Sequence, residues 1–188
     1  MPLTLTPCHL VGCYELTPKI FHDERGRFVK TYQAEVFRQQ GWATDWRETY
    51  YSVSRQGVLR GLHFQTPPQD HAKLVYCTAG TVLDAVVDLR RGSPTFGGHQ
   101  LLELSAEKAN MLYLPKGMAH GFYVTSATAT VHYQVTTVYA PACDAGIRWD
   151  SVGIPWPATA PLLSERDRHL PAWRHFDSPF VFAPPEGA

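Results

Sequence analysis

The chain has 188 residues, of which 44% are hydrophobic and 12% aromatic, so it can bury one substantial core and fits one domain better than two. Its 17 basic and 17 acidic residues give a formal net charge of +0, which argues against a protein that binds nucleic acid or an acidic membrane surface. We therefore predict a single domain over residues 1–188 with a flexible tail from about 180, and any anion that it binds is expected to be small.

The cysteines and the start of the chain indicate free thiols and no membrane segment. The cysteines form no C-x-x-C pair, and a chain of this length needs no disulfide to fold, so free thiols are expected at Cys8, Cys13, Cys77 and Cys143. Residues 1–5 lack the basic and apolar regions of a secretory signal, and no apolar run is long enough to span a bilayer. The sequence predicts a soluble cytoplasmic protein.

In chain order, the first predicted element is a short helix at 33–40, where Ala34 and Phe37 are followed by Gly41. Segments rich in Val, Thr, Tyr and Phe then recur between turn residues, and they predict strands at 72–78, 81–89, 99–104, 111–114, 121–125 and 128–139. A second short helix is predicted at 164–170. This pattern is typical of an all-β protein, and we predict a jelly-roll barrel with short peripheral helices.

Residues 115–120 have the sequence PKGMAH, the P-x-G-x-x-H form with which cupin barrels turn a strand and aim a histidine, here His120, inward. Cupins that hold a metal usually add a His-x-His pair on an earlier strand, whereas here Gln65 follows two residues after His63. Half of the usual set of metal ligands is missing. We therefore predict a cupin-type barrel with an acid-base site and with neither a metal nor a cofactor.

The strand-like run around His63 contains a second polar residue, Arg60, of opposite parity. An ideal strand cannot aim both side chains to one face, because successive side chains alternate. Gly61 lies between them, and a glycine within a strand permits a β-bulge or a close backbone approach. A bulge at this glycine would let both side chains point inward.

Two tyrosines and a lysine stand on other predicted strands. Tyr133 and Tyr139 have the same parity within 128–139, so both phenols are expected on one face. Taken alone, such a pair is more often part of a core than of a functional site. Lys73 begins another strand and either extends to the rim or is buried to stabilise negative charge; its position alone favours the rim.

Asp84 and Asp88 share one face of the predicted strand 81–89. Two carboxylates on one face would suit glycoside hydrolysis. Two arginines, Arg90 and Arg91, follow directly in the sequence. We therefore expect a pair of carboxylates at the strand end that is bonded to one of these arginines, rather than a catalytic pair.

Seven motifs that occur in order along the chain together resemble the dTDP-4-dehydrorhamnose 3,5-epimerase family. They are FHDERG at 21–26, RGLHFQ at 60–65, KLV at 73–75, VDLRRGSPTFG at 87–97, PKGMAHGF at 115–122, WP at 156–157 and LSERD at 163–167. The resemblance covers roughly the whole chain without a large insertion. It implies a cupin-type jelly roll that works as a homodimer without a metal, with the N-terminal segment reaching towards the partner subunit.

The family's activity is the inversion of carbons C3 and C5 of a nucleotide-diphosphate 4-keto-6-deoxy sugar. This reaction needs a base on one face of the sugar ring, an acid on the other, and donors at the developing enolate oxygen. The resemblance assigns the base to His63, with Asp167 as its carboxylate partner. It assigns the acid to Tyr133 and places Lys73 at the enolate oxygen.

The resemblance also implies residues that bind the substrate. Arg60 matches a diphosphate contact, which suits its forked donors. His120 is expected to line the same pocket, and Tyr139 to pack on the sugar or the nucleotide. Arg25 and Phe28 resemble residues of the nucleotide site near the dimer interface.

The chain departs from the family's usual pattern at positions of nucleotide recognition. Lys30 stands where a glutamate is usual, and Glu48 and Tyr50 stand in place of a Gln-x-Asn element. These changes alter the charge of groups that would bond the base edge, so Glu48 and Tyr50 are expected to contact the nucleotide, and a CDP- or GDP-linked sugar stays open beside dTDP. Changes at 69–72 and at Gln134 leave open whether C3 alone or both carbons are inverted.

Three other functions stay open as alternatives. A ketoisomerase acting on the same substrates also needs a base and an acid, although the combination of His63, Asp167 and Tyr133 favours epimerisation. Loss of one of these three residues would indicate a non-catalytic cupin that binds a nucleotide sugar, and all three are present. A metal-dependent cupin oxygenase is disfavoured by the absent His-x-His pair.

Overall fold

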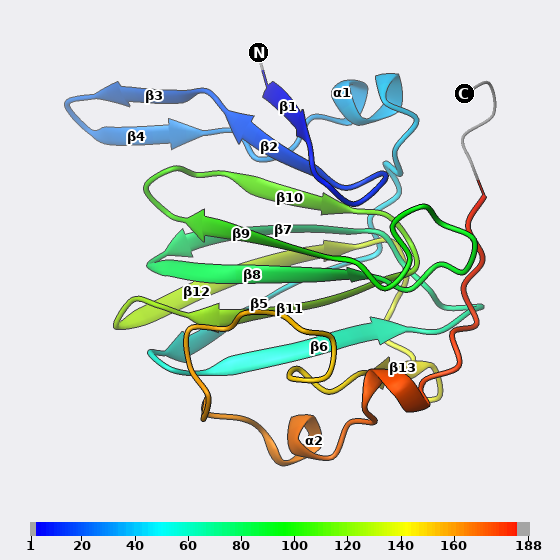
Figure 1. The fold of residues 1–188 in the computed structure, drawn as a ribbon. Coiled ribbons are helices and arrows are strands. Elements are labelled where there is room, and N and C mark those ends of the chain that lie inside the picture. Colours follow the sequence, from blue (N-terminus) through cyan, green and yellow to red (C-terminus); the bar gives the residue numbers. More distant parts are fainter. Residues whose placement is uncertain (1–2, 184–188) are drawn as a thin grey trace.

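The structure is a computed structural model that describes residues 3–183, and it contains two antiparallel sheets that face each other (Figure 1). The six-stranded sheet has the order β1 (Leu3–Pro7), β2 (Tyr14–Pro18), β10 (Met111–Leu114), β7 (Lys73–Ala79), β12 (Thr128–Val135) and β5 (Glu48–Arg55). The five-stranded sheet has the order β13 (Asp144–Gly146), β6 (Leu59–Gln65), β11 (Met118–Val124), β8 (Thr81–Asp88) and β9 (His99–Ser105). This is the all-β jelly-roll arrangement predicted from the sequence.

The remaining elements lie at the periphery of the barrel (Figure 1). Strands β3 (Ile20–Asp23) and β4 (Gly26–Val29) form a separate hairpin, drawn in blue at the upper left. The helices are short: α1 (Ala34–Gln39), α2 (Glu165–Arg168) and a 3₁₀ turn at Trp173–His175. The two predicted helices at 33–40 and 164–170 are confirmed with slightly narrower bounds. Within residues 3–183, no helix has the length and apolar character needed to cross a membrane.

The core between the two sheets is built from alternate residues of the strands. Side chains of one parity point inward on each strand, so a period of two places an apolar stripe inside the barrel. The largest cluster of buried side chains joins both sheets and includes Val75, Val86, Phe122, Val131 and Tyr133. A closed interior of this kind can bury the few polar side chains that share the inward parity.

The predicted strands match those of the structure between residues 72 and 135. The segment 111–114 is a strand with the same bounds, whereas the predicted strand 128–139 ends at Val135. The chain leaves the sheet there because Gln65 holds the following loop: its Nε2 donates to the Val138 carbonyl at 3.2 Å, and its Oε1 accepts from the Ala140 N–H at 2.7 Å. The predicted shared strand face of Tyr133 and Tyr139 is therefore wrong.

The predicted tail is wrong at its start. Phe180 is only 4% exposed, and its ring packs against Phe64 with centroids 5.7 Å apart. Val181 forms a β-bridge with Arg91. The segment around 180 therefore covers the outer face of the five-stranded sheet, and the rest of the predicted tail, residues 184–188, lies outside the described residues. The predicted free thiols at Cys8, Cys13, Cys77 and Cys143 are confirmed.

The bulge hypothesised in the strand of His63 is present in β6. His63 pairs with His120, and Arg60 pairs with Phe122, so one extra residue of β6 is accommodated between the two pairs. Gly61 lies in this interval with φ +140°, a conformation that side chains other than glycine's rarely adopt. Because residues directly opposite each other share a sheet face, Arg60 and His63 both join the inward face of His120 and Phe122.

Candidate active site

A cavity of about 380 Å³ opens into one end of the barrel. Its wall combines residues from both sheets, from the loop that follows β12, and from helix α2. They are Glu48, Tyr50, His63, Phe64, Gln65, His71, Lys73, Val135, Tyr139, Asp144 and Arg166. Five of the predicted site residues therefore line a single cavity: Glu48, Tyr50, His63, Lys73 and Tyr139.

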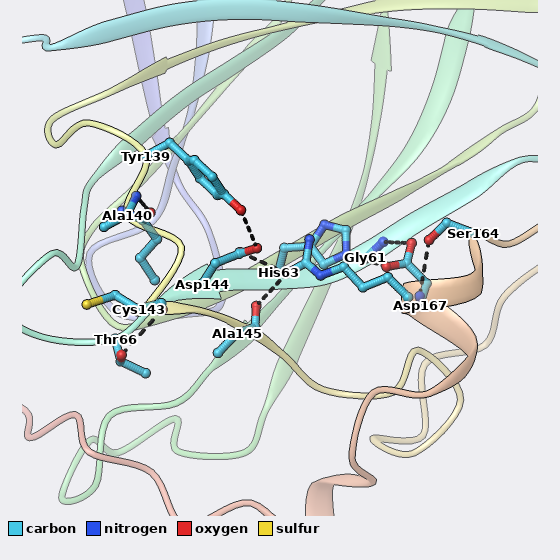
Figure 2. Close-up of polar contacts among 12 residues, drawn as sticks. Gly61, His63, Thr66, Tyr139, Ala140, Cys143, Asp144, Ala145, Ser164 and Asp167 are labelled. Atoms are coloured by element: carbon cyan, nitrogen blue, oxygen red, sulfur yellow. Dashed lines mark hydrogen bonds and ion pairs between the residues drawn. The ribbon is translucent and has the colours of Figure 1, made fainter.

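His63 and Asp167 form a histidine–carboxylate pair at this cavity (Figure 2). The Nε2 atom of His63 lies 2.6 Å from Oδ1 of Asp167, while Oδ2 of Asp167 accepts from the Gly61 N–H at 3.4 Å. Helix α2 carries Asp167, and Ser164 begins that helix by accepting the Asp167 N–H at 3.1 Å. The side chain of Asp167 is 3% exposed and that of His63 28% exposed, so the carboxylate is buried behind a ring that reaches the cavity.

The protonation of this pair follows from the surroundings of the carboxyl group. Burial by itself would raise the pKa of Asp167, but the hydrogen bonds from His63 and from the Gly61 N–H outweigh it, and the pKa is lowered. An ionised carboxylate can only accept hydrogen bonds, so the His63 Nε2 must carry the hydrogen of the 2.6 Å bond. In the neutral ring, Nδ1 is then free to accept a proton.

Lys73 is buried within the barrel, with 6% of its surface exposed, so the sequence-based expectation of a rim position is wrong. It stands on β7 with the same parity as the inward-facing Val75, and its Nζ donates to the His63 carbonyl at 3.3 Å. Burial lowers the pKa of Lys73 to about 8, although the carboxylates of Asp84 and Asp144 raise it. The structure therefore places a desolvated cation next to the histidine.

Tyr133 lies in the sheet opposite that of His63, beside the cavity rather than among the residues that line it. Tyr133 is on β12 and is 8% exposed; its ring stacks on Tyr50 with centroids 4.9 Å apart and makes an edge contact with His120 at 5.9 Å. Burial raises the pKa of the Tyr133 phenol far above its usual value. The phenol is therefore held neutral in the barrel interior, against Tyr50, which lines the cavity.

His120 and Asp84 form a second histidine–carboxylate pair, deeper in the barrel. The Nε2 of His120 lies 2.8 Å from Oδ2 of Asp84. The expectation that Asp84 bonds an arginine at the strand end is therefore wrong. It is right for Asp88, whose two oxygens each accept from Arg90 at 2.8 Å.

Arg60 lies near the same interior but outside the residues that line the cavity. Its Nε donates to the Ser54 Oγ on the neighbouring edge strand β5 at 3.0 Å. The bulge of β6 places it on the face of His63. An exposed guanidinium there is well placed to meet an anionic group that enters beside the cavity.

Arg25 and Phe28 are predicted site residues that lie away from the cavity and from the interior residues next to it. Both lie on the β3–β4 hairpin, away from the barrel's interior (Figure 1). Phe28 is 60% exposed, and the Arg25 side chain is 84% exposed and bonded to Asp23. A nucleotide role for this hairpin therefore depends on a second subunit.

Four polar residues that line the cavity were not singled out as site residues: Gln65, His71, Asp144 and Arg166. Arg166 donates to Asp144 at 2.8 Å. Asp144 also accepts from the Tyr139 hydroxyl at 3.3 Å (Figure 2). Asp144 lies in a strand of only three residues that has no alternating pattern of its own. Arg166 directly precedes Asp167 in the sequence, and this was the one sequence feature that could have identified Arg166 as a site residue.

Metal ligation has no support within residues 3–183, where no group of three or more His, Cys, Asp or Glu is placed to hold an ion. The donors present are instead arranged as acid-base pairs. The arrangement combines a histidine–carboxylate pair at the cavity, a buried phenol beside it and cationic donors, which are the groups that acid-base chemistry requires.

Comparison with known proteins identifies the family. The sequence profile of dTDP-4-dehydrorhamnose 3,5-epimerase matches residues 7–175. The dTDP-4-dehydrorhamnose 3,5-epimerase of Pseudomonas aeruginosa is 43% identical over 164 residues, which cover 85% of this chain and 90% of that protein. The chain belongs to the dTDP-4-dehydrorhamnose 3,5-epimerase family. The predicted epimerase is thereby confirmed.

Solved structures of the epimerase family have the same fold. The crystal structure of a dTDP-6-deoxy-D-glucose-3,5-epimerase from Legionella pneumophila in complex with dTDP-4-keto-L-rhamnose matches with a TM-score of 0.92 and 36% identity, over 97% of this chain and 100% of that chain. The structure of a 3'-monoepimerase from Streptomyces bikiniensis in complex with dTDP-quinovose matches with a TM-score of 0.84 and 36% identity, over 89% and 86%. The cupin-type jelly roll predicted for this epimerase is confirmed, and epimerases of one and of two centres share it.

Proposed function

We propose that this epimerase acts on a dTDP-linked 4-keto-6-deoxy sugar, with His63 as the base and Tyr133 as the acid on the opposite face of the sugar. The observation that carries the proposal is the His63–Asp167 pair at 2.6 Å, set at a cavity beside a buried cation. Related structures were solved with dTDP-4-keto-L-rhamnose and dTDP-quinovose, which supports dTDP as the nucleotide.

The first step is removal of a proton from a carbon beside the C4 ketone. His63 takes this proton, and Asp167 holds the ring through Nε2 and stabilises the imidazolium that forms. The electron pair of the broken C–H bond moves to the ketone and gives an enolate. We assign to Lys73 the donor to the enolate oxygen, a role worth about 10²–10³ in rate where single donors of an oxyanion have been removed.

The second step returns a proton to the same carbon from the opposite face of the ring. Tyr133 supplies it. Burial raises the pKa of the phenol and so keeps it protonated, and Tyr133 projects from the sheet that faces β6. The negative charge on its phenolate is then neutralised by a proton from solvent or from a neighbouring donor. Reprotonation by His63 would instead restore the starting configuration.

The diphosphate and the nucleotide are proposed to extend from the mouth of the cavity. Arg60 suits the diphosphate because its forked donors match phosphate oxygens. Glu48 and Tyr50 line the cavity on the edge strand β5, and Tyr139 on the loop after β12 is 60% exposed and free to pack on a ring. The CDP- and GDP-linked sugars remain the alternatives, because Glu48 and Tyr50 replace the family's usual amides.

A second candidate is inversion of C3 alone. The 3'-monoepimerase from Streptomyces bikiniensis supports keeping this candidate, since its 36% identity to this chain equals that of the 3,5-epimerase from Legionella pneumophila. The same base and acid serve either one or two carbons. The two outcomes differ only in whether C5 also reaches His63.

The test is exchange in heavy water. Purified protein is incubated separately with the dTDP, CDP and GDP forms of 4-keto-6-deoxyglucose, and loss of the C3 and C5 proton signals is followed by NMR. We expect loss at both carbons with the dTDP sugar; loss at C3 alone would establish the second candidate. His63→Ala is expected to abolish exchange at every carbon, and exchange at the wild-type rate in this variant would exclude His63 as the base.

Two further proposals concern the setting of the reaction. We propose a homodimer, in which the β3–β4 hairpin of one subunit completes the nucleotide site of its partner through Arg25 and Phe28. We also retain the expectation of a cytoplasmic enzyme. Neither bears on the acid-base steps, since the residues of those steps belong to one chain.

A further inference from the structure

The second histidine–carboxylate pair, Asp84–His120, lies inside the barrel next to the proposed base. His120 pairs directly with His63 across strands β11 and β6. Asp84 is 0% exposed and His120 is 3% exposed, in contrast to the cavity-lining His63. The pair therefore forms the layer of the barrel interior that lies beneath the reacting groups.

Asp84 has few hydrogen-bond partners for a buried carboxyl group. Its Oδ2 is bonded to His120, but among residues 3–183 nothing bonds its Oδ1. Its inward-facing neighbours on β8, Val82 and Val86, are apolar. A buried carboxylate with one free oxygen disfavours folding relative to an apolar side chain, so stability does not explain its presence here.

The groups around Asp84 are those of the proposed reaction. From β11, His120 donates to it; from β7, Lys73 interacts with its charge; and from β12, Tyr133 lies with its ring against His120. Burial raises the pKa of Asp84, while His120 and Lys73 lower it. The charge of Asp84 also raises the pKa of two thiols of the same core cluster, Cys77 and Cys8.

Lys73 is the group on which this charge has a chemical consequence. Burial lowers the pKa of Lys73 to about 8, near neutrality, and Asp84 and Asp144 oppose that effect while Arg166 adds to it. The ammonium has three donors, and its one bond within the described chain is to the His63 carbonyl. Without the carboxylate of Asp84, a larger fraction of Lys73 would be neutral at the pH of the reaction.

We propose that Asp84 is a positioning residue for the epimerisation, which holds the His120 ring against Tyr133 and keeps the Lys73 ammonium protonated beside the sugar ketone. This inference rests on the proposed function, because it assigns Asp84 a role in the reaction of His63, Tyr133 and Lys73. It predicts that the charge of Asp84, and not only its shape, is needed for turnover.

The test is Asp84→Asn, which removes the charge and keeps an acceptor for His120. We expect kcat to fall by at least about tenfold with KM changed by less than about twofold, since the substrate does not touch Asp84. The alkaline limb of the kcat profile is expected to move about one pH unit lower, because a neighbouring opposite charge that favoured the protonated Lys73 has been removed. A titration of Lys73 by NMR, without substrate, should show the same shift.

Two controls separate this role from a structural one. Val86→Thr adds a hydroxyl to the same inward face of β8, opposite His120, without changing charge, and it should leave the alkaline limb in place. Asp84→Asn is expected to fold, because a carboxyl whose pKa is raised by burial is easier to bury uncharged; Asp84→Ser provides a second uncharged variant.

The outcomes are distinct. An Asp84→Asn variant with unchanged kcat, or with lower kcat but an unmoved alkaline limb and unmoved Lys73 titration, would overturn the role of Asp84 while the active wild type upheld the proposed function. A wild-type protein that exchanges no proton with any of the three nucleotide sugars would overturn the proposed function and this inference with it.

Discussion

Asp167 and Asp84 both accept a hydrogen bond from the Nε2 of a histidine, yet their pKa values move in opposite directions. Asp167 has a second donor, the Gly61 N–H, and its pKa is lowered; Asp84 is fully buried with one donor, and its pKa is raised. Burial and the number of donors around each carboxylate therefore decide the direction in which its pKa shifts. Of the two histidines, only His63 reaches the cavity, which makes it the one able to act as the base.

Tyr133→Phe should separate the two proton transfers. We expect deuterium still to enter from the side of His63, because the enolate can form and be reprotonated there, while inversion slows about 10²-fold or more through loss of the acid. The measurement compares wash-out of the substrate signals with formation of the epimer by NMR. Tyr113→Phe is the matched control, since Tyr113 is a buried tyrosine on the outer face of the six-stranded sheet.

One specific result would contradict the assignment of Tyr133 as the acid. If Tyr133→Phe lost wash-out as completely as His63→Ala, the phenol would be needed to form the enolate and could not serve only as the opposite-face acid. Equal rates of inversion in the variant and the wild type would exclude the phenol from the reaction altogether.

At the scale of single residues, the sequence predicted which residues belong to the site better than it predicted their burial and their bonding partners. His63, Asp167 and Tyr133 were assigned through the resemblance, and the structure places them at or next to one cavity. Lys73 was expected at the rim because an isolated lysine at a strand end usually reaches water; its shared parity with Val75 was the overlooked indication of burial. The partner of Asp84 lies 36 residues away in the sequence, on another strand, so local pattern could not identify it.

Strand β6 shows how one irregular element assembles the site. Its bulge brings Arg60 and His63 to one face, and the glycine within it brings β6 close to β11. A Cβ atom at Gly61 would lie 2.6 Å from the Gly121 Cα and 3.1 Å from the His120 carbonyl oxygen. Both contacts are with backbone, which cannot move without disturbing the pairing of β11.

Gly61→Ala is therefore expected to destabilise the protein and to impair catalysis together. The φ of +140° alone costs about 1–3 kcal/mol for a residue with a side chain, and the backbone clash adds to it. Urea unfolding measures the loss. Gly92→Ala is the control, since Gly92 also has a positive φ but has open space around it, so its loss should be smaller. Equal losses in the two variants would contradict the importance of the close approach at Gly61.

The strands that the sequence predicted are those with two-residue alternation between residues 72 and 135. Strand β13 has three residues, and its register with β6 exists only through the fold. Strand β5 has the Tyr and Val content of a strand but exposes most of its residues as a sheet edge, so no apolar stripe marks it. The bulge of β6 was predictable because a glycine separated two polar residues of opposite parity.

On the scale of the whole molecule, the cavity depends on segments that are far apart in the sequence. Strand β5, strand β7, the loop after β12 and helix α2 each supply part of its wall. The close match to solved epimerases extends over this whole arrangement. The family resemblance predicted the architecture as a unit, whereas the short N-terminal strands and the C-terminal covering segment carried too little pattern to be found one by one.

The β3–β4 hairpin is a part of this architecture that supplies no residue to the cavity of its own subunit. Phe21 and Phe28 lie opposite each other on it, with ring centroids 6.4 Å apart and with 38% and 60% of their surfaces exposed. An exposed aromatic pair on a projecting hairpin is typical of a surface that meets a partner. We expect a homodimer in solution and a rise in KM of about tenfold for Phe28→Ser with kcat nearly unchanged, because the hairpin would contribute binding but no proton transfer.

His22→Ser is the control for this prediction, since His22 is on the same hairpin with the opposite parity from Phe21. Light scattering after size-exclusion chromatography gives the oligomeric state, and initial rates give KM and kcat for each variant. A monomeric wild type with full activity would exclude a shared site. A dimer in which Phe28→Ser binds the substrate normally would mean that the two subunits associate through another surface, and that each cavity binds its nucleotide without the hairpin of its partner.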